Sequence, residues 1–206
     1  MAAAGSGGEK PEEKAGEAAP GTPKKVETEE DAPAESREKV AAGTVTISPS
    51  DATMNVVYSP HNSLLTALAE GGWQYLLAGA RGTAGMKSGR HLFEVRVVES
   101  RARQEAASPA ARVVPQMQLC RVGLSTAGSS LLLGNAGGEG ASFDTEGFFV
   151  TGSVKKRVCP KQGHERAVVL GVLVNLDAAS PNANTMSLFA DGARMCEPQP
   201  IPPAML

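Results

Sequence analysis

The sequence predicts an all-β fold, a bent antiparallel β-sandwich that follows a disordered N-terminal tail. Three observations lead to this prediction. From residue 41 onward, short runs rich in β-branched and aromatic residues recur between turn residues. Two of the runs alternate apolar and polar residues, with the period of a half-buried strand. Strands do not alternate with helical segments along the chain, so a parallel sheet covered by helices is not expected.

The tail is set apart by its composition. Residues 1–40 hold ten acidic and six basic residues and consist mostly of Ala, Gly, Pro, Glu and Lys. They contain too little apolar surface to offset the entropy cost of ordering. A frayed, solvated helix is the alternative, and four prolines disfavour it. We therefore expect a disordered acidic tail over residues 1–40 and one domain over residues 41–206.

The charge of the chain limits its partners. The 206 residues carry a formal charge of −2 and the tail carries −4, so the rest of the chain carries about +2. A nearly neutral body does not fit a strongly basic nucleic-acid clamp, whose affinity comes mainly from phosphate neutralisation. A localised basic pocket remains compatible with this charge.

The cysteines and the N-terminus indicate the compartment. Cys120, Cys159 and Cys196 are widely spaced and include no Cys-x-x-Cys pair, which is typical of reduced thiols inside a cell. The first residues lack the basic and apolar regions of a signal peptide, and the longest apolar run is too short to span a membrane. We expect a soluble intracellular protein that is not secreted.

In the first half of the domain, three strands are expected from their β-branched or aromatic residues: Thr44–Ile47, Asn55–Tyr58 and Trp73–Ala78. The run Ser48-Pro49-Ser50-Asp51 predicts a turn between the first two strands, and the Gly-rich run Gly79–Gly85 predicts a turn after the third. Ser63–Glu70 is the only helix-like stretch, and it is short.

The second half begins with the clearest period-2 signal. In His91–Val98 the side chains of Phe93, Val95 and Val97 share one face, and Glu94 and Arg96 share the other. Cys120, Val122 and Leu124 alternate with Arg121 and Gly123 in the same way. Both segments are therefore predicted to be half-buried strands.

The last strands are predicted from apolar content and a turn signal. Val168–Leu176 is apolar on both faces, as in a central strand. Thr185–Ala190 is followed by Asp191-Gly192, a strong signal for a two-residue hairpin because glycine accepts a positive φ. These features complete a set of short strands separated by turns.

No pattern predicts a catalytic or metal site. The Gly-rich run Gly134–Gly140 lacks the Lys-Ser/Thr of a phosphate-binding loop, and we expect a flexible loop there. Ser125 lacks the Gly-x-Ser-x-Gly elbow of a nucleophile. The histidines are isolated, and Cys159 with His164 supplies only two potential metal ligands. Turn chemistry accounts for three further carboxylates: Asp144, Glu146 and Asp177. We expect no enzyme activity, no metal and no cofactor.

One basic run has two interpretations that the sequence leaves open. Lys155, Lys156 and Arg157, with Lys161 nearby, fit a solvated loop between strands that needs no function. They also fit a contact to nucleic acid or a weak nuclear-import signal.

Five segments resemble, in order, the strand motifs of SPRY (B30.2/SPRY-like) domains: Lys87–Val97, Arg121–Ser125, Ser142–Gly147, Val169–Asp177 and Thr185–Gly192. Upstream, Val45–Tyr58 and Trp73–Gly85 resemble the entry to the SPRY domains of heterogeneous nuclear ribonucleoprotein U and U-like proteins. A long Ala/Arg/Pro insertion, residues 101–118, separates the first two motifs.

The resemblance implies a non-catalytic protein-interaction module, a bent sandwich with a shallow peptide-binding surface. It also implies a nuclear, RNA-binding ribonucleoprotein of the U-like type, with cytoplasmic residence as the alternative. An Ash2-like chromatin or histone-methyltransferase cofactor is a second alternative. A third is the regulatory part of a polynucleotide-kinase-like enzyme whose catalytic domain lies outside this chain.

Two arginines match positions that bind acidic or phosphorylated segments in Ash2-like relatives. These are Arg81 in the predicted turn and Arg121 in the second motif. A guanidinium group binds a carboxylate or phosphate with two parallel hydrogen bonds, so both residues are candidate peptide-binding residues. The alternative is structural: Arg81 would bond turn carbonyls, and Arg121 would lie on the outer face of its strand.

The C-terminus is shorter than the resemblance leads one to expect. SPRY domains continue past the Asp191-Gly192 hairpin into two further strands, whereas this chain ends at Leu206. The faces that carry Val172 and Leu188 would then lose cover, and a sheet edge would open. We expect a fragment whose solubility and stability rise on extension by roughly 20–40 residues, a few strands' worth.

Overall fold

The computed structural model describes residues 40–41, 43–68, 70–73, 76–99, 119–134, 137–159 and 169–206. The expectations for the tail, for the insertion at residues 101–118, and for Lys161 and His164 lie outside these residues. The described chain is built of antiparallel strands joined by turns and loops, with a 3-10 turn, η2 (Pro203–Met205), near its C-terminus. The prediction of an all-β fold is confirmed. None of the described helices is both long and apolar enough to cross a membrane.

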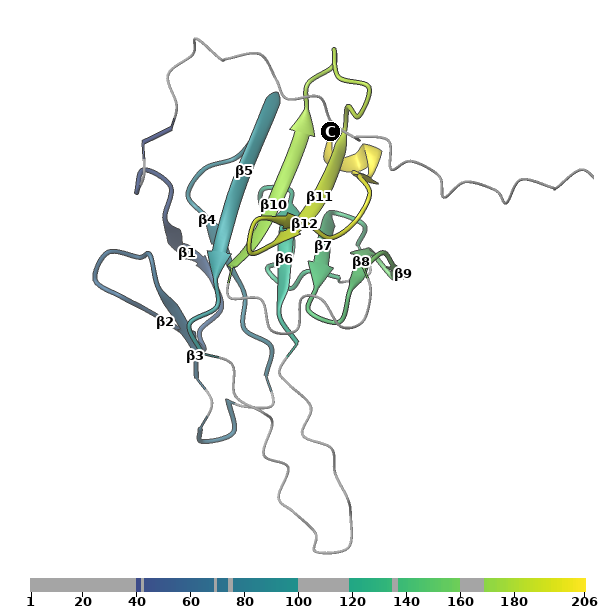
Figure 1. Ribbon diagram of the computed structural model, residues 1–206. Coiled ribbons are helices and arrows are strands. Elements are labelled where there is room, and N and C mark those ends of the chain that lie inside the picture. Colours follow the sequence, from purple (N-terminus) through teal and green to yellow (C-terminus); the bar gives the residue numbers. More distant parts are fainter. Residues whose placement is uncertain are drawn as a thin grey trace, which may run out of the picture.

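The larger sheet is built around the predicted central strand (Figure 1). β10 (Val169–Leu176) lies between β5 (Gly89–Arg96) and β11 (Thr185–Ala190), and Val172 pairs with Phe93 on one side and Leu188 on the other. Two strands of two residues each continue the sheet beside β11: β12 (Ala193–Arg194) and β13 (Gln199–Pro200). A strand that is apolar on both faces suits this central position.

The hairpin between β11 and β12 turns where the sequence predicts. Asp191 and Gly192 both have positive φ values, 48° and 83°. Positive φ at both central residues is the mark of a type I′ turn, whose twist matches that of the flanking strands. This prediction is confirmed.

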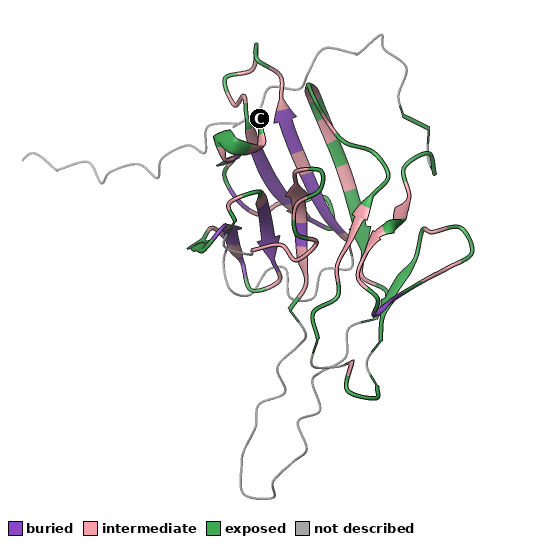
Figure 2. Ribbon diagram, turned by 180° about the vertical axis from the view of Figure 1, so that it is seen from behind, coloured by how far each residue is buried: buried purple, intermediate pink, exposed green. Residues whose placement is uncertain are grey.

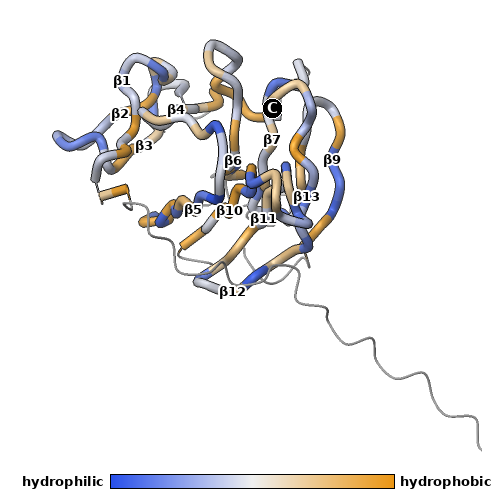
Figure 3. Tube along the Cα trace, turned by 90° about the horizontal axis from the view of Figure 1, so that it is seen from above, coloured by the Kyte–Doolittle hydropathy of each residue, from blue (hydrophilic) through white to orange (hydrophobic). Residues whose placement is uncertain are grey.

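The second sheet has four strands in the order β6-β7-β8-β9. They are consecutive in the chain: β6 (Arg121–Ser125), β7 (Gly140–Asp144), β8 (Phe148–Thr151) and β9 (Val154–Arg157). Seen from above, this meander lies across from the larger sheet (Figure 3). The alternation predicted for β6 is confirmed, because Val122 belongs to the core cluster and Cys120 and Leu124 pack against it.

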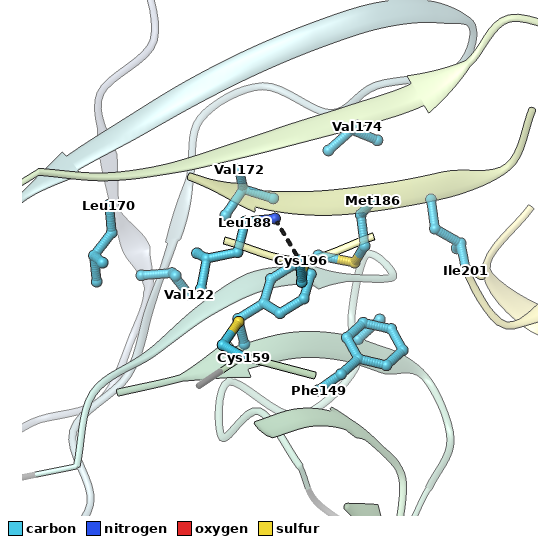
Figure 4. Packing of buried hydrophobic residues seen from close by; sticks show 12 residues of the cluster. Val122, Phe149, Cys159, Leu170, Val172, Val174, Met186, Leu188, Cys196 and Ile201 are labelled. Atoms are coloured by element: carbon cyan, nitrogen blue, oxygen red, sulfur yellow. Dashed lines mark hydrogen bonds between the residues drawn. The ribbon is translucent and has the colours of Figure 1, made fainter. Parts of the chain in front are cut away.

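The core fills the space between the two sheets (Figure 4). β10 and β11 supply Val172, Val174, Met186 and Leu188, each no more than 1% exposed. The opposite sheet supplies Phe143 and Phe149 among others, and their ring centroids lie 5.1 Å apart. Burying side chains of this size stabilises the fold by about 1.5–3 kcal/mol each.

On one side of β11, the neighbouring strand is interrupted, and a cysteine side chain lies at the gap. β12 ends at Arg194 and β13 begins at Gln199, so the middle of β11 is flanked by residues outside regular strands. There the Leu188 N–H donates to the Sγ atom of Cys196, 3.5 Å away, and the Leu188 carbonyl accepts from the Met195 N–H. A thiol takes the place of a backbone acceptor.

Two small antiparallel sheets stand beside the larger one (Figure 1). β1 (Ile47–Ala52) pairs with β4 (Ala80–Gly82), and β2 (Val56–Tyr58) pairs with β3 (Leu65–Ala67). The β2–β3 hairpin is largely exposed (Figure 2). It therefore adds little to the core.

The helix expected over Ser63–Glu70 is wrong. Residues 65–67 form β3, paired with β2 across a turn in which Asn62 has a φ of 51°. An isolated helix of this length is marginal in water because its first turn is costly to nucleate. Pairing with the neighbouring strand satisfies the same backbone groups.

The turn expected at Ser48-Pro49-Ser50-Asp51 is also wrong, because these residues belong to β1. The register against β4 shifts between Ile47 and Ala52, so the strand is irregular in the stretch that includes Pro49. Proline is tolerated in edge strands and bulges, where its missing N–H costs no ladder bond.

The strand expected over Trp73–Ala78 and the turn over Gly79–Gly85 are misplaced. Trp73 lies in a turn, and no strand is found among the described residues of 73–78. The strand falls later, at β4 (Ala80–Gly82), inside the predicted turn. Pairing with β1 decides this position, since local propensity favours neither segment strongly.

The expected loss of cover over Val172 and Leu188 is wrong. These side chains are 0% and 1% exposed. The last residues help to cover the core: Gln199–Pro200 forms β13 on β11, and Ile201 is 4% exposed. The C-terminal segment thus packs against the sheet that was expected to be left open.

Candidate functional site

Arg81 anchors a loop. From β4, its Nη1 atom forms a 2.8 Å ion pair with Asp51 Oδ2, and its Nε donates to Ser125 Oγ. Its Nη2 donates to the carbonyl of Ser129 at 2.9 Å and to the Ser129 hydroxyl at 3.3 Å. The side chain is 17% exposed. This is the arrangement that the structural alternative predicts, since the guanidinium bonds a turn carbonyl.

Arg121 reaches the same loop from β6. Its Nη1 donates to the carbonyl of Leu133 at 2.6 Å, and its buried Nε has no hydrogen-bond partner. Arg121 and Ser125 lie on one face of β6, because side chains alternate along a strand. The two arginines therefore hold residues 126–134 at two points, Ser129 and Leu133. No single anion pocket lined by both is formed by these contacts.

The four-stranded sheet has a polar face beneath this loop. Ser142 and Asp144 on β7 pair in register with Gly123 and Arg121. Ser142 Oγ and the Nε of Arg121 are buried without a hydrogen-bond partner, and the buried Oδ2 of Asp144 is engaged by an ion pair with Lys155 Nζ, 3.4 Å away. Buried polar atoms of this kind are usually bridged by ordered water.

Asp144 itself shapes a turn. Its Oδ1 accepts hydrogen bonds from the backbone N–H groups of Glu146 and Phe148, at 3.1 and 2.9 Å. In the same way, Asp177 Oδ1 accepts from the N–H of Ala179. The interpretation of Asp144 and Asp177 as turn residues is confirmed.

The basic run forms a strand, not the solvated loop that was one of its two interpretations. Lys155, Lys156 and Arg157 make up most of β9, whose four residues are all exposed. The segment lacks apolar alternation, and its conformation is set by the hairpin with β8. β9 is the last strand of its sheet and is strongly hydrophilic (Figure 3).

On one face of β9, two cations lie over the Phe148 ring. The Lys155 Nζ is 4.8 Å and the Arg157 guanidinium carbon is 4.3 Å from the ring centroid. Lys155 Nζ is also 3.4 Å from Asp144 Oδ2 and 3.7 Å from Glu146 Oε2, and Arg157 donates to the Glu146 carbonyl. These contacts fix the two side chains on the surface.

The opposite face of β9 borders a groove of about 350 Å³. Its lining includes Phe149, Val154, Lys156, Gln199, Ile201 and Pro202. Lys156 Nζ donates to Gln199 Oε1 at 3.2 Å and has no carboxylate partner among the described residues. The groove is thus largely apolar with one uncompensated cation at its rim.

The groove cannot be predicted from the sequence, because its second wall comes from residues 199–203. From the sequence, that segment is expected only to be the end of a shortened domain. The one sequence feature that could indicate a buried position in this segment is Ile201, an apolar residue among prolines. Only the pairing of β13 with β11 brings this wall opposite β8 and β9.

The cysteines lie inside the fold. Cys159 follows β9 and Cys196 follows β12; they are 3% and 7% exposed and belong to the core cluster (Figure 4). Interaction with the neighbouring Cys196 thiol, together with burial, raises the pKa of Cys159. Burial also raises the pKa of Cys120. All three are free thiols.

Histidines do not come together in the described part of the chain. His91 Nε2 lies 2.8 Å from the Ser88 carbonyl, in a local turn contact. No group of three His, Cys, Asp or Glu side chains suited to a metal ion occurs among the described residues. In the Gly-rich run, Gly134 packs against Arg121 and forms part of the arginine-anchored loop.

Neither the known protein families nor the curated proteins contain a match to this chain.

Proposed function

We propose that this chain is a non-catalytic protein-interaction module that binds an acidic peptide. One observation carries the proposal: Lys156, an exposed cation without a carboxylate partner among the described residues, stands at the rim of an apolar groove. Pockets that combine apolar walls with a few placed polar groups are the usual form of a recognition site. An uncompensated cation at the rim selects a negatively charged ligand.

The module is of the SPRY type in this proposal. The five motifs that resemble SPRY strands fall on β5, β6, β7, β10 and β11 or the turns that follow them. Their order along the chain and their distribution over two facing sheets support the assignment. In this proposal the module is part of a nuclear ribonucleoprotein in which other parts bind RNA, and the U-like resemblance of the upstream segments supports this.

In this proposal the two candidate peptide-binding arginines hold a loop in place. Arg81 and Arg121 both hold residues 126–134 through carbonyl groups. Arg121 keeps donor atoms that no described residue engages, so it remains a candidate for anion contact once a ligand displaces the loop. Arg81 uses Nε, Nη1 and Nη2 in contacts within the chain.

The proposal is tested by selection from a random peptide library displayed on phage, with the 206-residue chain as the immobilised target. We expect a consensus rich in Glu or Asp to emerge. A heat-denatured sample of the same chain serves as the control for adhesive peptides. Selection that yields no consensus, or the same peptides on the denatured chain, would contradict an interaction module.

A further inference from the structure

β9 leaves one of its two edges unpaired among the described residues. It is last in the order β6-β7-β8-β9, and its residues pair only with β8. The hairpin turns through Gly152 and Ser153, with Gly152 at a φ of 53°, and Thr151 pairs with Val154. Residues that flank a two-residue turn bond to each other, and bonding then alternates along the ladder. The N–H and C=O groups of Lys155 and Arg157 therefore point away from β8.

The hydrogen bonds made by the residues after β9 agree with this alternation of inward and outward backbone groups. Gly147, which precedes β8, accepts hydrogen bonds from the N–H groups of Val158 and Cys159. Residue 158 is thus turned inward, and its neighbour Arg157 is turned outward. An edge with free donors and acceptors at alternate residues is a template for another extended chain.

The two faces of this edge offer different chemistry. Lys155 and Arg157 lie on the face with Phe148, and Val154 and Lys156 lie on the face with the groove. A strand paired with β9 would place every second side chain over the groove and the others beside Lys155 and Arg157. The groove face suits an apolar side chain, and the other face suits a carboxylate.

We propose that β9 binds an acidic peptide by strand addition, and that the peptide alternates acidic and apolar residues. This rests on the proposed function and names its ligand and its site. The apolar residue opposite Lys156 enters the groove against Phe149 and Ile201. The acidic residues on either side of it meet Lys155 and Arg157, and the backbone pairs with the outward groups of those two residues.

Charge complementarity supports this occupant. β9 carries three basic residues, and the carboxylates beside it are Asp144 and Glu146, which pair with Lys155. Asp144 is 2% exposed, and its Oδ1 already accepts hydrogen bonds from backbone N–H groups. Positive charge on the edge therefore exceeds the negative charge beside it. A carboxylate on the incoming strand that lies beside Lys155 or Arg157 gains a charge-assisted hydrogen bond.

Single-stranded RNA fits this surface less well. Nucleic-acid grooves combine phosphate contacts with aromatic rings on which bases stack. The only aromatic ring among the residues beside Lys155 and Arg157 on this face of the strand pair is Phe148, and both cations already lie over it. Strand addition uses the backbone edge as well, which RNA leaves unpaired.

The experiment measures binding of a fluorescent peptide with the core Glu-Leu-Glu-Leu-Glu to the 206-residue chain by anisotropy. The Lys156→Glu variant places a carboxylate at the rim of the groove, where the apolar side chain enters, and removes positive charge from the strand that pairs with the acidic peptide. It should bind the peptide about tenfold more weakly. Lys87→Glu makes the same charge change at an exposed lysine before β5 and should bind within about twofold of the parent. Methylation of alternate peptide backbone nitrogens should remove binding in one register and spare it in the other.

The outcomes separate the inference from the proposed function. Equal weakening by Lys156→Glu and Lys87→Glu, or unchanged binding by both N-methylated peptides, would overturn strand addition at β9. If the phage selection still yields an acidic consensus, the module stands and its site lies elsewhere. Binding of oligouridine that Lys156→Glu abolishes, with no binding of the peptide, would overturn the inference in favour of nucleic acid.

Discussion

Gly134 lies directly against the guanidinium group of Arg121. A Cβ atom at this glycine would stand 2.5 Å from Arg121 Nη1 and 3.1 Å from Val150 Cγ1. Gly134 also has a φ of 83°, which side chains other than glycine rarely adopt. The loop of residues 126–134 thus depends on a glycine for its conformation and for the room it leaves to the arginine.

Gly134→Ala should lower the free energy of unfolding by about 1–3 kcal/mol, the cost of a strained backbone at such a position. Urea unfolding followed by circular dichroism measures the loss. Gly128→Ala is the matched control, since Gly128 has a φ of 76° in the same loop and open space around its Cβ position. A larger loss for Gly134→Ala reports the contact with Arg121, and equal losses would show that the contact is unimportant.

Arg81→Lys should destabilise the chain by about 1–3 kcal/mol, because a lysine cannot reach Ser125 and Ser129 with separate donors. Asp51→Asn removes only the ion pair to a carboxylate that is 45% exposed, and its loss should stay below about 1 kcal/mol. Thermal unfolding of both variants makes the comparison. If Asp51→Asn costs as much as Arg81→Lys, the ion pair and not the loop anchor is what matters.

How much of the fold the sequence predicts depends on whether the signal is local. β10 and the Asp191-Gly192 hairpin follow from apolar runs and turn chemistry contained in a few neighbouring residues. β1 and β3 do not, because each is formed by pairing with another segment: β1 with β4, farther along the chain, and β3 with β2, which precedes it. Pro49 and the short run after Ser63 even favour the wrong local structure.

The candidate site divides in the same way. Arg81 and Arg121 could be picked out from their motifs, but their acceptors lie 48 and 12 residues away in the chain and only the folded structure pairs them. The basic run could be seen in the sequence. The sequence does not show that Lys156 of this run shares a groove with Gln199, which lies 43 residues later in the chain.

Leu188→Ala should cost about 2–5 kcal/mol, since the side chain is 1% exposed in the core between the sheets. Met186→Leu, at a neighbouring core position of similar volume, should cost less than about 1.5 kcal/mol. Chemical denaturation of the full chain gives both values. A loss for Leu188→Ala that is no larger than that for Met186→Leu would mean that β11 is loosely packed.

Raising the pH should weaken the fold through Cys120. Burial raises the pKa of this thiol in the folded chain. In the unfolded chain it ionises near its ordinary pKa of about 8.5. The contribution of Cys120 to stability is therefore complete below about pH 8.5 and is lost as the pH rises above it.

The test compares urea midpoints of the parent chain and Cys120→Ser at a series of pH values. We expect the midpoint of the parent to fall more steeply above about pH 8.5 than that of the variant. Below this pH the difference between the two should stay constant. Parallel curves throughout would show that Cys120 ionises alike in both states.

The sulfur of Cys196 stands where β11 would otherwise meet the carbonyl of a neighbouring strand, and the Leu188 N–H bonds to it. Chemistry at this thiol is consequently coupled to the order of the sheet. A group attached to Cys196, at a position 7% exposed, would move the sulfur away from that amide. Hydrogen exchange at the single amide of Leu188 would then accelerate, so that one backbone proton in the interior records whether a cysteine has been modified.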